Sequence, residues 1–84
     1  MSRIEIYSRD RCQFCNAAKR LLANKGLVFE EIQLDLEPFR HQEMMDRTGG
    51  RTVPQILIDG QAVGGFEEIV ELNEDGALAR LVNI

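Results

Sequence analysis

The chain has 84 residues, 44% of them hydrophobic and 29% charged, so we expect one globular domain spanning residues 1–84. Its formal net charge of −4 gives no electrostatic reason to expect nucleic acid or an anionic membrane surface as a partner. No stretch approaches the roughly 20 apolar residues of a membrane span, and no secretory signal is recognisable, so we expect a cytoplasmic protein.

The first half of the chain alternates between strand and helix patterns. Residues 3–7 alternate in hydrophobicity and contain two isoleucines, which predicts a strand. Residues 13–25 repeat apolar side chains at helical spacing, which predicts a helix that ends at the following glycine. Residues 27–36 alternate again, with Val28 near the start of the apolar face, and predict a second strand.

The second half opens with a predicted helix over residues 38–48, whose first residue is a proline, as suits the first turn of a helix. The apolar stripe of this helix is thin and consists of Phe39, Met44 and Met45. Residues 55–58 and 61–63 flank an Asp-Gly pair and predict a β-hairpin. Another helix is predicted over residues 66–75, and a last helical segment after Gly76.

The predicted order is strand, helix, strand, helix, strand, strand, helix. An opening strand–helix–strand unit implies two parallel strands, and the hairpin adds two antiparallel strands. We therefore predict an α/β domain with a four-stranded mixed sheet flanked by helices.

The only two cysteines, Cys12 and Cys15, stand where the first strand pattern gives way to the first helix pattern. In a cytoplasmic protein two cysteines are more often redox-active or metal-binding than permanently disulfide-bonded. A structural disulfide closing about four residues would contribute only roughly 2 kcal/mol before any native strain. A zinc site would need four ligands, whereas the pair supplies two and the chain has one histidine, His41. A metal site bridging two chains stays open as an alternative.

The redox interpretation fits the position of the pair as well as its spacing. Cys12 is predicted at the start of a helix, where free backbone N–H groups and the helix dipole favour a thiolate, and Arg9 and Arg11 flank it. A thiol with a pKa near 8.5 would be only ~3% ionised at pH 7, and lowering that pKa by two or more units would make the thiolate the major form. Cys15 is predicted one turn further along, deeper against the helix. We therefore expect Cys12 to attack a disulfide and Cys15 to resolve the intermediate.

Three motifs resemble those of the glutaredoxins, in particular the small dithiol type found in bacteria. They are C-Q-F-C at residues 12–15, T-V-P at 52–54 before the hairpin, and G-G at 64–65 before the next helix. The resemblance runs essentially from end to end. It implies a thioredoxin-like fold and a glutathione-dependent thiol–disulfide oxidoreductase, which reduces protein disulfides and glutathione mixed disulfides. Its role would be electron transport and cell redox homeostasis.

The resemblance also implies a binding site for glutathione. Val53, preceding a cis-proline at Pro54, would pair with the cysteinyl unit through its backbone. The first N–H groups of the helix after the two glycines would receive the γ-glutamyl carboxylate, and an acidic side chain there would meet the ammonium group. Arg9 would hold the glycyl carboxylate, with His41 as a weaker candidate. The glutathione-binding residues implied in this way are Arg9, Phe14, Thr52, Val53, Pro54, Gly65, Phe66, Glu67 and Glu68.

The chain departs from the family pattern in the middle of the cysteine motif, where Gln13 and Phe14 replace the commoner proline and tyrosine. Family members that lack this proline can bind a [2Fe–2S] cluster between two chains, so the alternative function is a glutathione-ligated cluster-binding dimer with Cys12 as the protein ligand. Otherwise we expect a monomer without a metal site. The expected partners are glutathione and glutathionylated or disulfide-containing proteins, with ribonucleotide reductase as one candidate.

Overall fold

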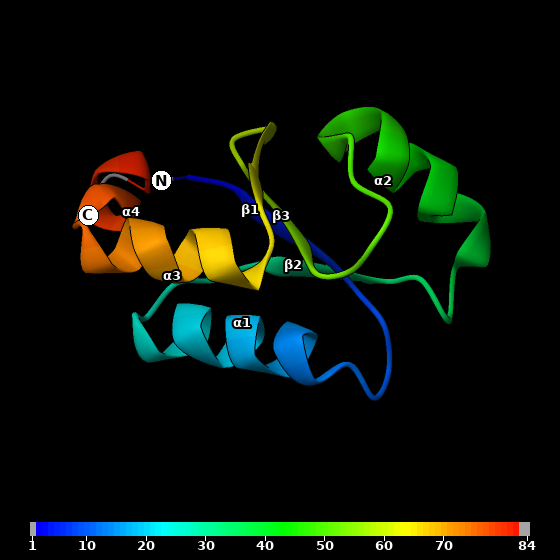
Figure 1. The fold of residues 1–84 in the computed structure, drawn as a ribbon, viewed down its shortest axis with the longest axis horizontal. Helices are drawn as coiled ribbons and strands as arrows, with labels where there is room; N and C mark the ends of the chain where they lie inside the picture. The colour runs from blue at the N-terminus through cyan, green and yellow to red at the C-terminus, as the bar shows by residue number, and fades with distance from the viewer. Residues whose placement is uncertain (1, 83–84) are drawn as a thin grey trace.

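The computed structural model of the protein describes residues 2–82, and its centre is a four-stranded sheet in the order β2-β1-β3-β4 (Figure 1). Strand β1 (Ile4–Ser8) pairs in parallel with β2 (Glu30–Gln33) and antiparallel with β3 (Gln55–Ile58). Strand β4 (Gln61–Gly64) pairs antiparallel with β3. The predicted mixed sheet is confirmed, and with it the thioredoxin-like fold.

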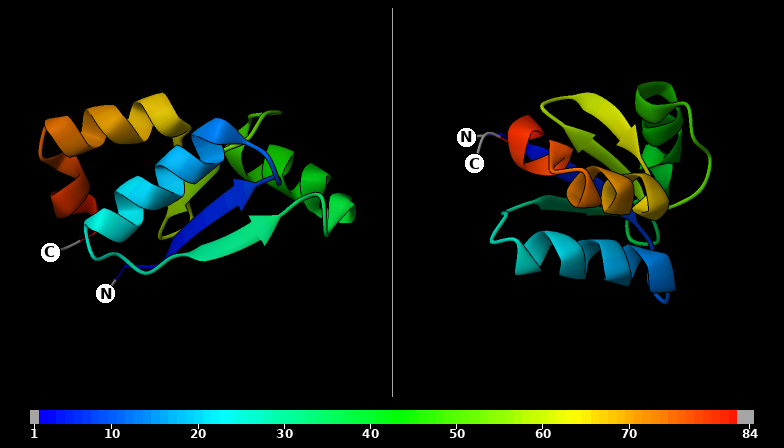
Figure 2. Two further views of the ribbon diagram at one scale, coloured as in Figure 1. Left: turned by 90° about the horizontal axis from the view of Figure 1, so that it is seen from below. Right: turned by 60° about the vertical axis from the view of Figure 1, so that its left-hand side comes forward.

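Helices cover both faces of this sheet. They are α1 (Gln13–Asn24), α2 (His41–Thr48), α3 (Phe66–Glu74) and α4 (Ala77–Leu81), with a 3-10 turn at Pro38–Arg40 directly before α2. Helices α1 and α3 lie side by side on one face, and α2 lies on the other (Figure 2). None of the helices within residues 2–82 is long and apolar enough to cross a membrane.

The central strand β1 is buried on both of its faces because helices cover both sides of the sheet. Successive side chains of a strand point to opposite faces. Accordingly, Ile4 and Ile6 pack in the core beneath α1, α3 and α4, whereas Tyr7 packs with Met44 in the core beneath α2. The C-terminal end of β1 leads directly into the loop that carries Cys12, so the best-buried strand of the sheet supports the candidate site.

Most of the predicted elements are confirmed to within one or two residues, but the second strand is wrong at both ends. The prediction covered 27–36, whereas β2 pairs with β1 only over Glu30–Gln33. The side chain of Val28 is 80% exposed, so it does not begin an apolar face. β2 is an edge strand, and its pairing with β1 covers only the four positions opposite residues 5–8.

The apolar stripe predicted for the second helix is also partly wrong. Met44 is fully buried and Met45 packs against the same core, but Phe39 is 78% exposed. Phe39 belongs to the 3-10 turn, which has three residues per turn, and its side chain is therefore out of phase with the buried face of α2. The β-hairpin is confirmed, with Asp59 and Gly60 both at positive φ, as its two-residue turn requires.

Candidate active site

The two cysteines lie at the start of α1, directly after the loop that leaves β1. Cys12 is the N-cap residue of α1, and its Sγ accepts a hydrogen bond from the backbone N–H of Cys15 at 3.1 Å. The two sulfur atoms are within bonding distance, and the Cα atoms lie 5.1 Å apart. The pair can therefore open and close as a disulfide, which is the chemistry of thiol–disulfide exchange.

The two sulfur-bearing residues differ in exposure and in surroundings. Cys12 is half-buried and solvent reaches it, whereas Cys15 is fully buried on the face of α1 that packs against the sheet. Cys12 also sits where the first N–H groups of α1 have no partner within the helix, and these groups favour an anion. The arrangement makes Cys12 the thiol that a disulfide in solution can reach.

The loop before Cys12 turns sharply through a left-handed residue. Arg11 has a φ of 58°, a conformation that few non-glycine residues adopt. Arg9 and Arg11 are both exposed, and within residues 2–82 neither forms an ion pair. Their charges therefore add to the positive potential on this side of Cys12.

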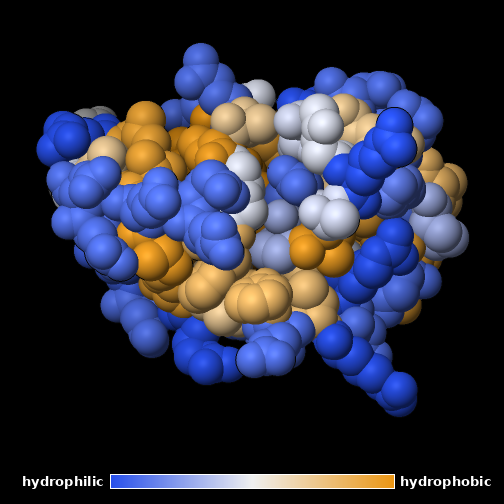
Figure 3. Space-filling model, viewed as in Figure 1, coloured by the Kyte–Doolittle hydropathy of each residue, from blue (hydrophilic) through white to orange (hydrophobic). Residues whose placement is uncertain are grey.

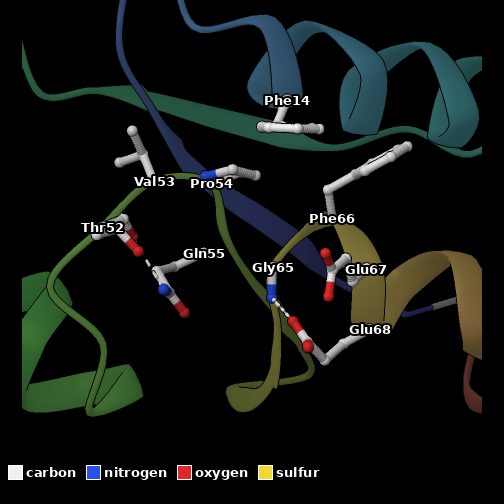
Figure 4. Close-up of a pocket in the computed structure, with 9 residues that line it drawn as sticks. All are labelled: Phe14, Thr52, Val53, Pro54, Gln55, Gly65, Phe66, Glu67 and Glu68. Carbon is white, nitrogen blue, oxygen red and sulfur yellow. Dashed lines mark hydrogen bonds between the residues drawn. The ribbon is translucent and has the colours of Figure 1, made fainter.

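A pocket of about 210 Å³ opens beside the start of α1 and is formed by three separate parts of the chain (Figure 4). Its lining residues are Phe14, Thr52, Val53, Pro54, Gln55, Gly65, Phe66, Glu67 and Glu68. The structure thus brings together eight of the nine residues implied by the family resemblance, and it leaves Arg9 outside this lining, on the loop before Cys12. Gln55 was missed, although its position directly after T-V-P is a signal that could have identified it.

One wall of the pocket is apolar. The rings of Phe14 from α1 and Phe66 from α3 lie with centroids 5.8 Å apart, and Pro54 faces Phe14 across the opening (Figure 4). The Val53–Pro54 peptide bond is cis, as the resemblance implied. Figure 3 shows these helices from outside, with apolar side chains gathered along the line where α1 and α3 face each other. A ligand in the pocket would contact apolar surface contributed by all three chain segments.

The lining continues from Phe66 along the start of α3, and both glycines before this helix are needed for local reasons. Gly64 has a φ of 116°, which L side chains rarely adopt. A Cβ atom on Gly65 would lie 3.2 Å from the carbonyl oxygen of Pro54, so this residue permits the close approach of α3 to the Pro54 loop. The two walls of the pocket are close together because glycine stands at this junction.

The two acidic residues at the start of α3 have different hydrogen-bonding states. Glu68 accepts a hydrogen bond at its Oε1 from the backbone N–H of Gly65, at 2.7 Å, and so caps its own helix (Figure 4). Within the described part of the chain, the Glu67 carboxylate forms no such bond and no ion pair. Glu67 is therefore the carboxylate in this wall that remains available to a cationic group.

On the face of the sheet that α2 covers, a charged network connects β1 to α2. Arg47 donates two hydrogen bonds to the buried Glu5 carboxylate, at 2.8 and 2.9 Å, and a third to the Tyr7 hydroxyl at 3.0 Å. The Tyr7 hydroxyl in turn donates to Glu43. The hydrogen bonds from Arg47 hold the pKa of Glu5 below its ordinary value, while burial and the bond to Glu43 raise the pKa of Tyr7. No pattern in the sequence indicates this network, because a glutamate between two isoleucines is typical of the exposed position of a strand.

His41, the weaker candidate for glutathione binding, does not line the pocket. Its Nε2 lies 3.2 Å from the carbonyl oxygen of Arg51, so it connects the start of α2 to the loop before Thr52. No group of three or more His, Cys, Asp or Glu side chains within residues 2–82 is placed to hold a metal ion. Cys12 could therefore ligate iron only together with groups from outside this part of the chain.

Comparison with known proteins connects this geometry to a family. The family model described as Glutaredoxin matches residues 4–63, which include both cysteines and the T-V-P motif. Glutaredoxin 3 of Escherichia coli strain K12 is 40% identical over 82 residues, which cover 98% of this chain and 99% of that protein. Glutaredoxin of Neisseria meningitidis serogroup A is 38% identical over 84 residues, with 99% of each chain covered. The crystal structure of the buckwheat glutaredoxin–glutathione complex superposes with a TM-score of 0.88 at 29% identity, covering 95% of this chain and 76% of that one.

Proposed function

This chain belongs to the glutaredoxin family and is a glutathione-dependent thiol–disulfide oxidoreductase, and from that premise we propose that its Cys12–Cys15 pair reduces both glutathione mixed disulfides and protein disulfides. The observation that carries the proposal is the asymmetry of the pair. Cys12 is reached by solvent and accepts a helix N–H at its sulfur, whereas Cys15 is buried one turn further along. Cys12 would therefore be the attacking thiolate and Cys15 the resolving thiol.

Glutathione would bind in the pocket between Phe14, the Pro54 loop and the start of α3. The support is that Phe14, which lines this pocket, stands two residues after Cys12, and that the similar buckwheat protein forms a complex with glutathione. Its cysteinyl unit would pair with the backbone of Val53. Its γ-glutamyl carboxylate would meet the first N–H groups of α3, and its ammonium group would meet Glu67. Arg9, on the loop before Cys12, would hold the glycyl carboxylate.

With a glutathionylated protein, the Cys12 thiolate would attack the glutathione sulfur. A Cys12–glutathione disulfide forms, the original disulfide breaks, and the protein thiolate leaves and takes a proton from water. A second glutathione thiolate then attacks the glutathione held on Cys12. This step releases oxidised glutathione and restores the Cys12 thiolate, so in each turnover one free glutathione thiol is consumed and one protein thiol is released.

With a protein disulfide, the attack of Cys12 would leave one substrate sulfur bound to Cys12 and the other as a free thiol. Cys15 then loses its proton and attacks Cys12, which releases the second substrate thiol and forms the Cys12–Cys15 disulfide. Two glutathione molecules reduce this disulfide and leave as oxidised glutathione. We further propose that ribonucleotide reductase is one such substrate, and that the protein works as a monomer in the cytoplasm, where glutathione keeps thiols reduced.

The test combines an absorbance spectrum of freshly purified protein with glutathione-coupled reduction of the cysteine–glutathione mixed disulfide on the same sample. Colourless protein whose turnover depends on Cys12 is the expected result. The alternative is a [2Fe–2S] cluster held between two copies, which the accessible Cys12 sulfur could ligate together with glutathione. Brown protein with visible bands, dimeric and inactive until the cluster is lost, would favour that alternative.

A further inference from the structure

The connection between α2 and β3, which carries the T-V-P motif, is held in place by side chains. Within the described part of the chain, the backbone groups of residues 51–53 form no hydrogen bond with other backbone groups. Instead, His41 contacts the carbonyl oxygen of Arg51 at 3.2 Å. The Nε2 of Gln55 donates a hydrogen bond to the carbonyl oxygen of Thr52 at 2.9 Å (Figure 4). The path of the α2–β3 connection therefore depends on these side chains, because no helix or sheet ladder fixes its backbone.

The side chain of Gln55 also packs against the start of the α2–β3 connection. Gln55 is the first residue of β3, and a Cβ atom on Gly50 would lie 2.7 Å from its Cδ. The amide group of Gln55 thus occupies the space that any side chain at position 50 would need. The φ of Gly50 lies outside the left-handed region, so this packing, and not the backbone conformation, favours glycine there.

The hydrogen bond from Gln55 also determines the direction of the next backbone N–H group. The carbonyl of Thr52 and the N–H of Val53 belong to one planar trans peptide unit, in which the two groups point in opposite directions. The Val53 N–H itself forms no hydrogen bond within the described residues. The bond that Gln55 donates on one side of this peptide unit therefore orients a free N–H group on the other side.

From this geometry we propose that Gln55 is a positioning residue for glutathione. The inference rests on the proposed function, in which the backbone of Val53 pairs with the cysteinyl unit of glutathione. Such pairing needs a free N–H group that is already oriented, because ordering the backbone during binding would weaken the interaction. Gln55 supplies this orientation through the Thr52–Val53 peptide unit.

The test measures single-turnover reactions of the reduced protein with two small disulfides. The first is the cysteine–glutathione mixed disulfide, whose glutathione part would pair with Val53. The second is bis(2-hydroxyethyl) disulfide, which has no peptide group to pair. Acid quenching and mass spectrometry of the protein give both rate constants. We expect Gln55→Ala to lower the first rate constant about fivefold, as the loss of one neutral hydrogen bond predicts, and to leave the second unchanged.

Gly50→Ala tests the same bond independently, since its methyl group would displace the amide of Gln55 without removing it. This variant should lower the first rate constant as Gln55→Ala does. The Gly50→Ala/Gln55→Ala double variant should be no slower than either single variant, because both changes remove the same bond. The matched control is Gln61→Ala, because Gln61 is an exposed glutamine on β4 outside the pocket lining. It should react as the wild-type protein with both disulfides.

The inference is overturned if Gln55→Ala reacts as the wild-type protein with the cysteine–glutathione mixed disulfide, or if Gln61→Ala shows the same loss. It is also overturned if the effects of Gly50→Ala and Gln55→Ala multiply in the double variant, or if Gln55→Ala slows both disulfides equally, which would place its effect on Cys12. A wild-type protein that does not prefer the glutathione disulfide is a different failure, since it would contradict glutathione binding in the proposed function and the inference with it.

Discussion

The chemistry of this protein depends first on how differently its two cysteines are placed within one turn of helix. Cys12 precedes the helix and accepts a backbone N–H at its sulfur, and Cys15 faces the sheet and is fully buried. Burial raises the free energy of a thiolate, whereas helix N–H groups lower it. Substituting one cysteine at a time should therefore distinguish the roles of the two thiols.

We expect Cys12→Ser to reduce thiol transfer to the uncatalysed background with every substrate, because it removes the accessible thiolate. Cys15→Ser should still reduce glutathione mixed disulfides, but should lose turnover on protein disulfides, which need the resolving thiol. Glutathione-coupled assays with one substrate of each kind measure both effects. Activity remaining in Cys12→Ser would make Cys15 the nucleophile, and an equal loss on both substrates in Cys15→Ser would contradict its resolving role.

Substituting the two adjacent glutamates of α3 should affect different properties of the protein. Glu67→Ala should raise the KM for a glutathione mixed disulfide about fivefold with kcat unchanged, because an exposed ion pair contributes at most about 1 kcal/mol. Glu68→Ala should instead lower the free energy of unfolding by about 1 kcal/mol, because its carboxylate caps the helix at Gly65. Steady-state kinetics and urea unfolding on both variants check the assignment, and the reverse pattern would exchange the two roles.

At the scale of the elements, the ion pair between Glu5 and Arg47 holds β1 and α2 together. The two residues are far apart in the sequence, and Glu5 is almost completely buried in the central strand. Helix α2 ends at Thr48 and is capped by Gly49, and the chain then runs to Val53 and Pro54 in the lining of the pocket. The ion pair therefore fixes α2 relative to β1. The loop that carries Val53 and Pro54 follows α2, and the loop that carries Cys12 follows β1.

Arg47→Met should destabilise the protein by roughly 3 kcal/mol, because it leaves the buried Glu5 carboxylate with only the exposed Arg3, at 3.5 Å, as a partner. The Glu5→Leu/Arg47→Met double variant should recover much of this loss, since no buried charge then remains. Urea unfolding of both variants measures the difference. A double variant that is less stable than Arg47→Met would show that the two residues do not act as a pair.

At the scale of the whole molecule, two carboxylates anchor the two faces of the sheet, the buried Glu5 and the half-buried Glu31. Glu5 faces α2, and on the other side Glu31 accepts hydrogen bonds from Lys19 of α1 at 2.7 Å and from Ser8 at 2.6 Å. Burial raises the pKa of Glu31, but these hydrogen bonds outweigh it and the net shift is downward. The pKa of Glu5 is lowered as well, chiefly by its hydrogen bonds with Arg47.

Because both folded-state pKa values lie below the unfolded value of about 4.3, the stabilisation from these carboxylates is complete well above that pH and is lost as the pH falls through the folded-state values. The free energy of unfolding should therefore decrease on acidification below about pH 4. Urea unfolding at neutral pH and at acidic pH measures the decrease. The Glu5→Gln/Glu31→Gln variant should show a smaller decrease than the wild-type protein, and an unchanged one would contradict this origin.

Most of the fold was predictable because its signals are local. Periodicity places α1, α3 and the hairpin, and the Asp59–Gly60 turn needs no tertiary information. The wrong predictions concern features that depend on neighbouring elements of the fold. The extent of β2 depends on where it pairs with its neighbour β1, and the exposure of Phe39 depends on the 3-10 turn before α2.

The sequence by itself determined the order of strands and helices, the position of Cys12 at a helix start and the resemblance to the glutaredoxins, because periodicity, capping and motif spacing are properties of neighbouring residues. Only the tertiary structure decided that Cys15 is buried, that Glu67 is left free while Glu68 caps α3, and that Glu5 pairs with Arg47. These properties depend on which segments pack against each other in the folded chain. No local sequence pattern specifies contacts between residues that are far apart in the sequence.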